Sequence, residues 1–313
     1  MQIKEIVARA YPGDRIQNYE LSTAPEISYQ VSLEKTGDVY LNQYTGEILG
    51  VRSKEEFLDY VHQLHIRLLW RGKNDPGKTI ITWSGVAALF LACSGLYLWW
   101  PLKRTWVARG TTGRRVWFDL HSVTGIFSFL FLLLLTLTGV MLGFERSTNQ
   151  LLYRITGTQP SPMPRSVPAP PEGATPLSPD QAIEIARGAV PGATPFLIVV
   201  PEPRGAYQIR LRYPEDRTPG GRSRAFVDQY TGKVLFAEGS RTAPAGTRWA
   251  IAYRAIHTGD IFGRGSKIVM SVASLAIAFQ MFSGMVMWWK RIRGKRDAAI
   301  LAATLAKNQQ AGP

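Results

Sequence analysis

Four histidines and one cysteine are the side chains of this sequence with the clearest capacity for metal chemistry. The histidines are His62, His65, His121 and His257. The single cysteine, Cys93, excludes an internal disulfide framework, a cysteine-rich zinc site and a cysteine-ligated iron–sulfur cluster. Any metal or haem chemistry based on imidazole must therefore use these four residues.

The elements that would position them include three uncharged apolar blocks, at 80–100, 122–144 and 268–289. A bilayer core about 30 Å thick requires about 20 apolar residues in a helix. A helix buried in a soluble protein usually shows a shorter apolar run. We therefore predict transmembrane helices at 79–101, 117–144 and 267–290. Tryptophans stand at the ends of two blocks, as expected at a membrane interface: Trp99, Trp100, Trp288 and Trp289.

The net charge of +14 arises from 37 Lys and Arg against 23 Asp and Glu. Such a surplus is typical of proteins that bind nucleic acid or an anionic membrane surface. Much of it lies beside the apolar blocks, at 102–116 and 290–296, where basic residues indicate the cytoplasmic side. We expect a multi-pass protein of a bacterial inner membrane, embedded in the lipid bilayer, with the N-terminal segment and 145–266 outside. A nucleic-acid partner is not expected.

One sequence unit occurs twice. The segments VYLNQYTGEILG (39–50) and AFVDQYTGKVLF (225–236) both predict a hairpin, with Gly46 and Gly232 in the turn. Each hairpin follows a short helix, a Pro-Gly pair and a strand. Each is followed by a histidine, His65 or His257, and by an apolar block that ends SGLYLWW or SGMVMWW. The duplication predicts two α+β modules, each leading to a histidine and a spanning helix.

The predicted fold class is an α-helical membrane bundle that carries two small α+β modules, at 1–53 and 180–240. An interfacial helix with His62 and His65 is expected at 54–78, and an interfacial segment with His257 at 241–266. We also expect a basic loop at 102–116, a Pro-rich linker at 145–179 and a cytoplasmic tail at 291–313. A fourth, N-terminal helix is expected as well, because the second repeat begins with a helix that the first lacks and 1–15 contains no apolar export signal.

The QYTG hairpins, the Leu-His or Ile-His pair before a helix ending SG-x-x-x-WW, and the helix opening DLHSVTG resemble the PepSY-associated transmembrane family of iron-regulated bacterial inner-membrane proteins. The resemblance covers nearly the whole chain. It implies two PepSY-like periplasmic modules and a haem-dependent ferric-siderophore reductase with one or two haem b groups. The chain has no nicotinamide, flavin or ATP motif of its own, so its electrons would come from a quinol or a redox protein.

His65 and His257 occupy equivalent places in the two repeats. Two neutral imidazoles that face each other across a pseudo-symmetry axis could ligate one haem iron from both sides. The alternative is that both are ordinary interfacial histidines, solvated or hydrogen-bonded. Cations close in sequence could bind the haem propionates: Arg67, Arg71, Arg254, Arg264 and Lys267.

His121 lies near the cytoplasmic end of the second apolar helix, where an ionisable residue is a candidate functional group. Gly125 lies one turn further on the same face and would leave room for a porphyrin. The natural second ligand would be a histidine on the expected N-terminal helix. Alternatively, His121 hydrogen-bonds Asp119 or a loop group. His62 is interpreted as a surface or supporting residue, and as an alternative ligand.

Three functions remain open. The first is electron transfer through haem to a periplasmic ferric siderophore or similar anionic chelate. The second is a membrane-anchored binding or regulatory protein without redox chemistry, whose modules bind a peptide, a protease or a partner protein by strand addition. The third, a transport accessory, is the weakest, because no broken helix pair marks a midplane site. For the first, the second module offers basic residues that could equally be a solvated face: Arg204, Arg210, Arg212, Arg222 and Arg224.

Overall fold

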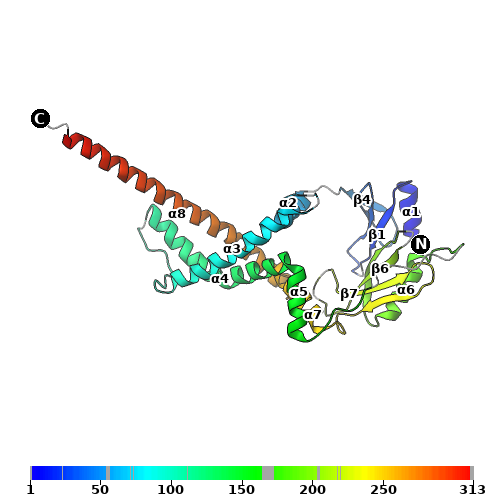
Figure 1. Ribbon diagram of the computed structural model, residues 1–313. Helices are drawn as coiled ribbons and strands as arrows, with labels where there is room; N and C mark the ends of the chain where they lie inside the picture. Colours follow the sequence, from blue (N-terminus) through cyan, green and yellow to red (C-terminus); the bar gives the residue numbers. More distant parts are fainter. Residues whose placement is uncertain are drawn as a thin grey trace. The chain divides into compact units, whose positions relative to one another are not determined.

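The computed structural model describes residues 2–22, 24–53, 57–70, 72, 74–110, 112–163, 173–202, 205–216, 218 and 220–310. The chain divides into two compact units. One comprises the residues up to 81 together with 144–255, and the other comprises 82–143 and the residues from 256 onward. Figure 1 labels the helices and some of the strands.

Among the described residues, three helices are long and apolar enough to cross a membrane: α3 (Pro76–Trp99), α4 (Arg114–Gly143) and α8 (Arg264–Gln310). The prediction of three such helices is confirmed. Helix α3 begins where its sequence favours a start, because Asp75 accepts a hydrogen bond from the Lys78 amide at 3.0 Å and Pro76 occupies the first helical position. Helix α8 continues far past the predicted span, since residues 290–310 contain no proline and many good helix formers.

The second unit is built around α4, which contacts both other apolar helices. Gly143 of α4 lies against Thr82 of α3, so that a side chain at this glycine would collide with the threonine. At the other end of α4, Trp117 makes an edge-to-face contact with Phe282 of α8, with ring centroids 5.6 Å apart. In lipid the hydrophobic effect does not drive helices together. Close contact at small residues and aromatic packing therefore stabilise the association of these helices.

The first unit contains one antiparallel sheet of eight strands in the order β4-β3-β2-β1-β5-β6-β7-β8. The strands are β1 (Ile16–Glu20), β2 (Tyr29–Leu33), β3 (Asp38–Leu41), β4 (Ile48–Arg52), β5 (Thr194–Val199), β6 (Ala206–Arg212), β7 (Ser223–Asp228) and β8 (Val234–Glu238). The sequence predicts two separate modules, whereas the structure joins the two repeats into one sheet through β1 and β5.

The two repeats meet in a symmetric register. Tyr19 of β1 pairs with Ile198 of β5, and these residues hold equivalent places after the Pro-Gly pair of each repeat. Both repeats also carry a register irregularity in their first strand, at Ile16/Asn18 and at Pro195/Leu197. The duplication is therefore present in the backbone hydrogen bonding as well as in the sequence.

Two helices cover the same face of this sheet and close its core. They are α1 (Gln2–Ala10), which contributes Val7, and α6 (Pro179–Ala189), which contributes Ala182 and Ala186. Helix α6 begins with a capping box, in which Ser178 and Gln181 bond each other's backbone amides. Tyr19 lies in this core, and burial, with smaller effects of Tyr207 and Asp180, raises its pKa to about 12.

The hairpin turns of the two repeats match atom by atom. Asn42 accepts hydrogen bonds from the backbone amides of the two residues at 44 and 45, and Asp228 does the same for 230 and 231. The next residue, Gln43 or Gln229, donates its side-chain amide to backbone carbonyls of the loop between the first two strands of its own repeat. Each turn thus fixes a loop that is remote in sequence.

Three further helices lie along the chain between the strands and the apolar helices: α2 (Phe57–Arg67), α5 (Glu145–Thr156) and α7 (Ala245–Thr258). Helix α5 occupies the start of the segment that the sequence predicts as a Pro-rich linker, because its first proline is Pro160. Helix α5 packs on α7, where Tyr153 bonds Thr247 at 2.9 Å and Tyr253 bonds Asn149 at 3.2 Å.

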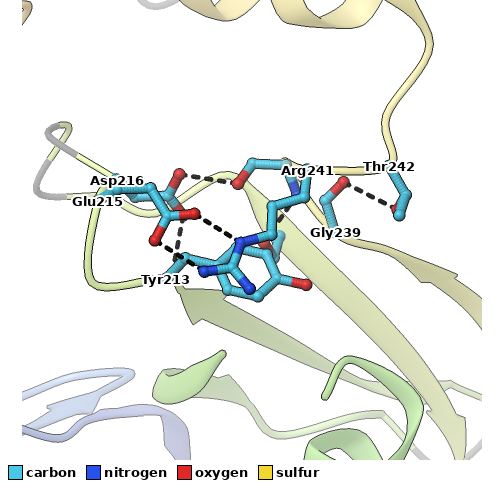
Figure 2. Close-up of polar contacts among 8 residues, drawn as sticks. Tyr213, Glu215, Asp216, Gly239, Arg241 and Thr242 are labelled. Atoms are coloured by element: carbon cyan, nitrogen blue, oxygen red, sulfur yellow. Dashed lines mark hydrogen bonds and ion pairs between the residues drawn. The ribbon is translucent and has the colours of Figure 1, made fainter. Parts of the chain in front are cut away.

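A polar cluster connects the loop after β6 to the segment after β8 (Figure 2). Arg241 donates two hydrogen bonds to Glu215, at 2.6 and 3.0 Å, while its guanidinium lies 4.1 Å from the ring centroid of Tyr213. Ser240 donates to Asp216 at 2.7 Å. The hydrogen bond from Arg241 lowers the pKa of Glu215 below its usual value. The cluster therefore anchors the chain between β8 and α7.

Candidate functional site

An apolar cavity lies between α3, α4 and α8, and all of its lining residues belong to the second unit. Its volume is about 730 Å³, which is within the range of cofactor pockets. Three of its lining residues are glycines, Gly95, Gly125 and Gly284, one on each helix. Among the described lining residues, His121 is the one with an ionisable side chain. The structure thus brings His121 and Gly125 to one cavity.

The His121 ring is held by α8. Its Nδ1 lies 2.8 Å from the Ser283 hydroxyl, and Ser283 is fully buried. An added Cβ at Gly284 would lie 3.7 Å from Cε1 of His121, which is ordinary van der Waals contact. The alternative of a bond to Asp119 is not what the structure shows, because His121 bonds Ser283 instead.

A second set of hydrogen bonds fixes the backbone beside this ring. The side-chain amide of Gln280 donates to the His121 carbonyl at 3.1 Å and to the Thr124 hydroxyl at 2.7 Å. An added Cβ at Gly125 would lie 3.4 Å from this amide. Gln280, the one polar amide in the third apolar block, therefore ties α8 to the turn of α4 that carries His121.

His257, at the end of α7, has a similar environment at the other end of α4. Its Nδ1 lies 3.1 Å from the Thr138 hydroxyl. An added Cβ at Gly139 would lie 3.3 Å from its Cε1, so a side chain there would require the ring to move by a few tenths of an ångström. Both imidazoles thus rest on a hydroxyl residue followed by glycine.

These two rings belong to different levels of the bundle. Residues 121 and 138 are 17 positions apart on one helix, which corresponds to about 26 Å along its axis. Two histidines that ligate the same iron need nitrogens only about 4 Å apart, two bonds of about 2 Å each. His121 and His257 therefore cannot share one metal ion.

A family comparison supplies the assignment. The family model of the PepSY-associated TM region matches residues 2–291. The chain belongs to the PepSY-associated TM region family. The match includes the sheet, the three apolar helices and all four histidines, and the chain is accordingly a multi-pass membrane protein of the PepSY-associated kind. A comparison with curated proteins finds no match.

In this PepSY-associated chain, His62 and His65 lie on α2, in the first unit, and both are exposed. Helix α2 has no buried residue, and apolar side chains such as Leu58 and Leu64 are also exposed on it. The turn after α2 packs on the start of α3, where Gly77 lies against the Arg67 carbonyl. The pairing of His65 with His257 remains a prediction.

The cations expected near the propionates have acidic partners. Arg67 lies 3.6 Å from Asp75, and Arg254 donates to Glu145 at 3.2 Å. Lys267 lies 2.8 Å from Asp260. Arg264 is the first residue of α8, whereas Arg71 lies outside the described residues.

The basic face predicted for the second repeat lies mainly on β6 and β7. Arg210 and Arg212 are exposed on β6, and Arg210 pairs across the sheet with Arg224. Arg224 lies 4.0 Å from Glu238, so part of its charge is balanced. Arg222 precedes β7, and Arg204 lies outside the described residues.

A buried carboxylate organises the basic loop near His121. Asp119 is fully buried, accepts a hydrogen bond from Arg104 at 2.8 Å and accepts another from the Ala108 amide at 3.2 Å. The Trp99 indole donates to the Arg104 carbonyl at 2.8 Å. This network positions the loop between α3 and α4 beside the end of the cavity.

Sequence reasoning did not identify Ser283, Thr138 and Gln280 as partners of the candidate histidine sites. A signal was available, because a hydroxyl residue is followed by glycine at 94–95, 124–125, 138–139 and 283–284. In an apolar helix such pairs usually indicate close helix packing, so the signal does not distinguish a histidine contact from ordinary packing.

Proposed function

We propose that the chain is a membrane haem protein that passes electrons to a ferric chelate outside the cytoplasm, with an iron-bound siderophore as the substrate class. The observation that carries this proposal is the apolar cavity of about 730 Å³ with the single imidazole of His121 and a glycine on each of its three helices. The family assignment supports a membrane protein of this architecture.

The residues of the cavity suit a haem better than a bare metal ion. Within the part of the chain that the structure describes, no group of three or more His, Cys, Asp or Glu side chains could hold a metal ion. A porphyrin supplies four nitrogens itself and asks the protein for only one or two axial ligands. The cavity offers one, His121, and its apolar walls and glycines suit a flat macrocycle. A second axial ligand would come from outside this cavity.

When bound, haem b would supply a one-electron couple for reducing the ferric chelate, with a quinol or redox protein as the electron source. Reduction favours release because Fe(II) binds hard oxygen ligands more weakly than Fe(III). The protein residues would tune this couple through the axial imidazole, its hydrogen-bond partner and the exclusion of water. His257 is the candidate axial ligand at the second level of the bundle, with His65 as its proposed partner.

The direction of electron flow follows from the charges. The basic segments 102–116 and 290–296 flank the ends of α3, α4 and α8 that lie at the His121 level, and basic loops favour the cytoplasmic side. We therefore assign His121 to the inner side and His257 to the periplasmic side of an inner membrane. The sheet would then lie in the periplasm as a pair of joined PepSY-like modules. The exposed Arg210 and Arg212 suit an anionic chelate.

An absorption spectrum tests the proposal directly. The full chain, purified in detergent from haem-replete bacterial cells, should give a Soret band and a sharp α band on reduction. The reduced protein should then be reoxidised by a ferric siderophore but not by the gallium complex of the same siderophore, because Ga(III) does not accept an electron. A colourless preparation, unchanged by His121→Ala, would reject the redox function.

A second candidate function rests on the edge of the sheet. Strand β4 ends the strand order, and its apolar residues Leu49 and Val51 are 57% and 47% exposed. An exposed edge with apolar side chains can accept an extended peptide as an added strand. In this case the chain would be a membrane-anchored regulatory or scaffolding protein that binds a peptide, a protease or another partner. Binding of a peptide that Val51→Lys abolishes, in haem-free protein, would favour it.

A further inference from the structure

The Ser283 hydroxyl has one proton, and this proton can bond a backbone carbonyl of its own helix, α8. Its Oγ lies 2.7 Å from the Phe279 carbonyl, to which it donates. A serine hydroxyl has a single donor and two acceptor lone pairs. With that proton directed at the Phe279 carbonyl, the hydroxyl accepts from His121, 2.8 Å away, and this network assigns the proton in that bond to Nδ1 of the imidazole.

The same count applies at His257. The Thr138 hydroxyl donates to the Leu134 carbonyl at 2.5 Å, so it accepts from Nδ1 of His257 at 3.1 Å. In a neutral imidazole with its proton on Nδ1, the lone pair is on Nε2. The two rings, at opposite ends of α4, thus share one arrangement, although their hydroxyl partners come from different helices.

We infer that Ser283 and Thr138 are positioning residues that fix the Nδ1–H tautomer of His121 and His257, so that each histidine presents Nε2 to iron. This inference rests on the proposed function and adds to it the ligating atom and the residues that select it. Ligating histidines commonly donate their second ring N–H to an acceptor, which fixes the ring orientation and raises the basicity of the ligating nitrogen.

Helix α8 provides a matched control. Ser274 lies on α8, like Ser283, but it is exposed and is not among the residues that line the cavity. The Ser274 hydroxyl donates to the Ser271 carbonyl at 2.7 Å, so it bonds its own helix as the Ser283 hydroxyl does. Loss of the Ser274 hydroxyl should therefore leave the histidines unaffected.

The test uses the full chain carrying His257→Ala, so that only the His121 site is measured. Ser283→Ala, Ser283→Thr and Ser274→Ala are compared by haem titration of the apoprotein, by equilibrium redox titration and by electron paramagnetic resonance of the oxidised form. Ser283→Ala should weaken haem binding by about 10- to 100-fold. It should also raise the reduction potential, because a less basic imidazole stabilises Fe(III) less. Ser283→Thr retains the hydroxyl and should resemble the parent, as should Ser274→Ala.

The outcomes separate this inference from the proposed function. If the parent binds no haem, the proposed function fails. If the parent binds haem and Ser283→Ala keeps the same affinity and potential, the inference is wrong. Equal losses in Ser283→Ala and Ser274→Ala would also contradict it, because they would indicate a general effect of removing a helix hydroxyl. Should Ser283→Ala fail to fold, Thr138→Val in a His121→Ala chain makes the same test at His257, since valine keeps the shape of threonine without its hydroxyl.

Discussion

Replacing His121 and His257 one at a time tests whether the chain holds two independent haem sites. The α4 residues at these two rings are 17 positions apart, or about 26 Å along the axis, whereas two ligands of one iron need about 4 Å between their nitrogens. Effects at sites this far apart should add. If both sites are filled, each alanine variant should therefore keep about half of the haem, and the double variant should keep none.

The assay is the haem content per chain, measured from the pyridine haemochrome spectrum of protein purified in detergent. Cys93→Ala, a change at an exposed position of α3, serves as the control and should keep the full content. In electron paramagnetic resonance spectra of the same oxidised samples, each single variant should lose the signals of one haem. A folded single variant that loses all of its haem, from a parent that holds two haems per chain, would refute the two-level reasoning.

Three further predictions concern the fold. Gly46→Ala should lower the free energy of unfolding by about 1–2 kcal/mol, because alanine is strained at φ +73° and its Cβ would press on the Ile6 side chain. Gly50→Ala, with no atom within 4 Å of the added Cβ, should not lower it. Chemical denaturation of the full chain measures both. Burial would raise the pKa of Asp14, but hydrogen bonds from backbone amides lower this pKa to about 2. The contribution of Asp14 to stability should therefore be complete above about pH 4 and disappear as the pH falls toward 2. Asp14→Asn should make the denaturation midpoint depend less on pH over that range. Asp119→Ala should destabilise the second unit by on the order of 2 kcal/mol and speed trypsin cleavage of the basic loop, because it leaves the partly buried Arg104 without its buried carboxylate. Arg115→Ala removes only an exposed, 3.8 Å partner of Asp119 and should cost less than about 1 kcal/mol.

Each of these predictions has a clear contrary result. Equal destabilisation by the two glycine variants would mean that backbone conformation does not decide the cost at Gly46. If stability falls in the same way between about pH 4 and 2 in Asp14→Asn, another carboxylate controls that loss. Slower or unchanged cleavage of the loop in Asp119→Ala would show that the Arg104 ion pair does not hold the loop.

The apolar helices could be predicted from the sequence because their signal is local. An uncharged run of more than 20 residues, as at 122–144, has few alternatives to a membrane span. The turns were equally accessible, since Gly46 and Gly232 follow the same QYT triplet and both have positive φ. In such segments the residues that determine the structure are neighbours in the chain.

The junction of the two repeats could not be predicted in this way. Strand β1 pairs with β5, which lies about 180 residues further along the chain, and nothing in IQNYE distinguishes a central strand from an edge strand. The hydroxyl partners of the histidines were missed for a related reason. Ser283 and Thr138 have the residue types of ordinary helix packing, and only the tertiary structure reveals that an imidazole lies against each.

The register of β1 against β5 has a consequence for how such a chain could have originated. Tyr19 and Ile198 pair with each other, and the residues on either side exchange places: Asn18 pairs with Val199 and Glu20 with Leu197. Two identical copies of one repeat could form the same contact about a true two-fold axis, because an isologous interface requires each residue to meet its counterpart in this way. A half-length ancestor with a single helix-and-four-strand repeat could therefore have built this sheet as a homodimer before gene fusion made the pairing intramolecular.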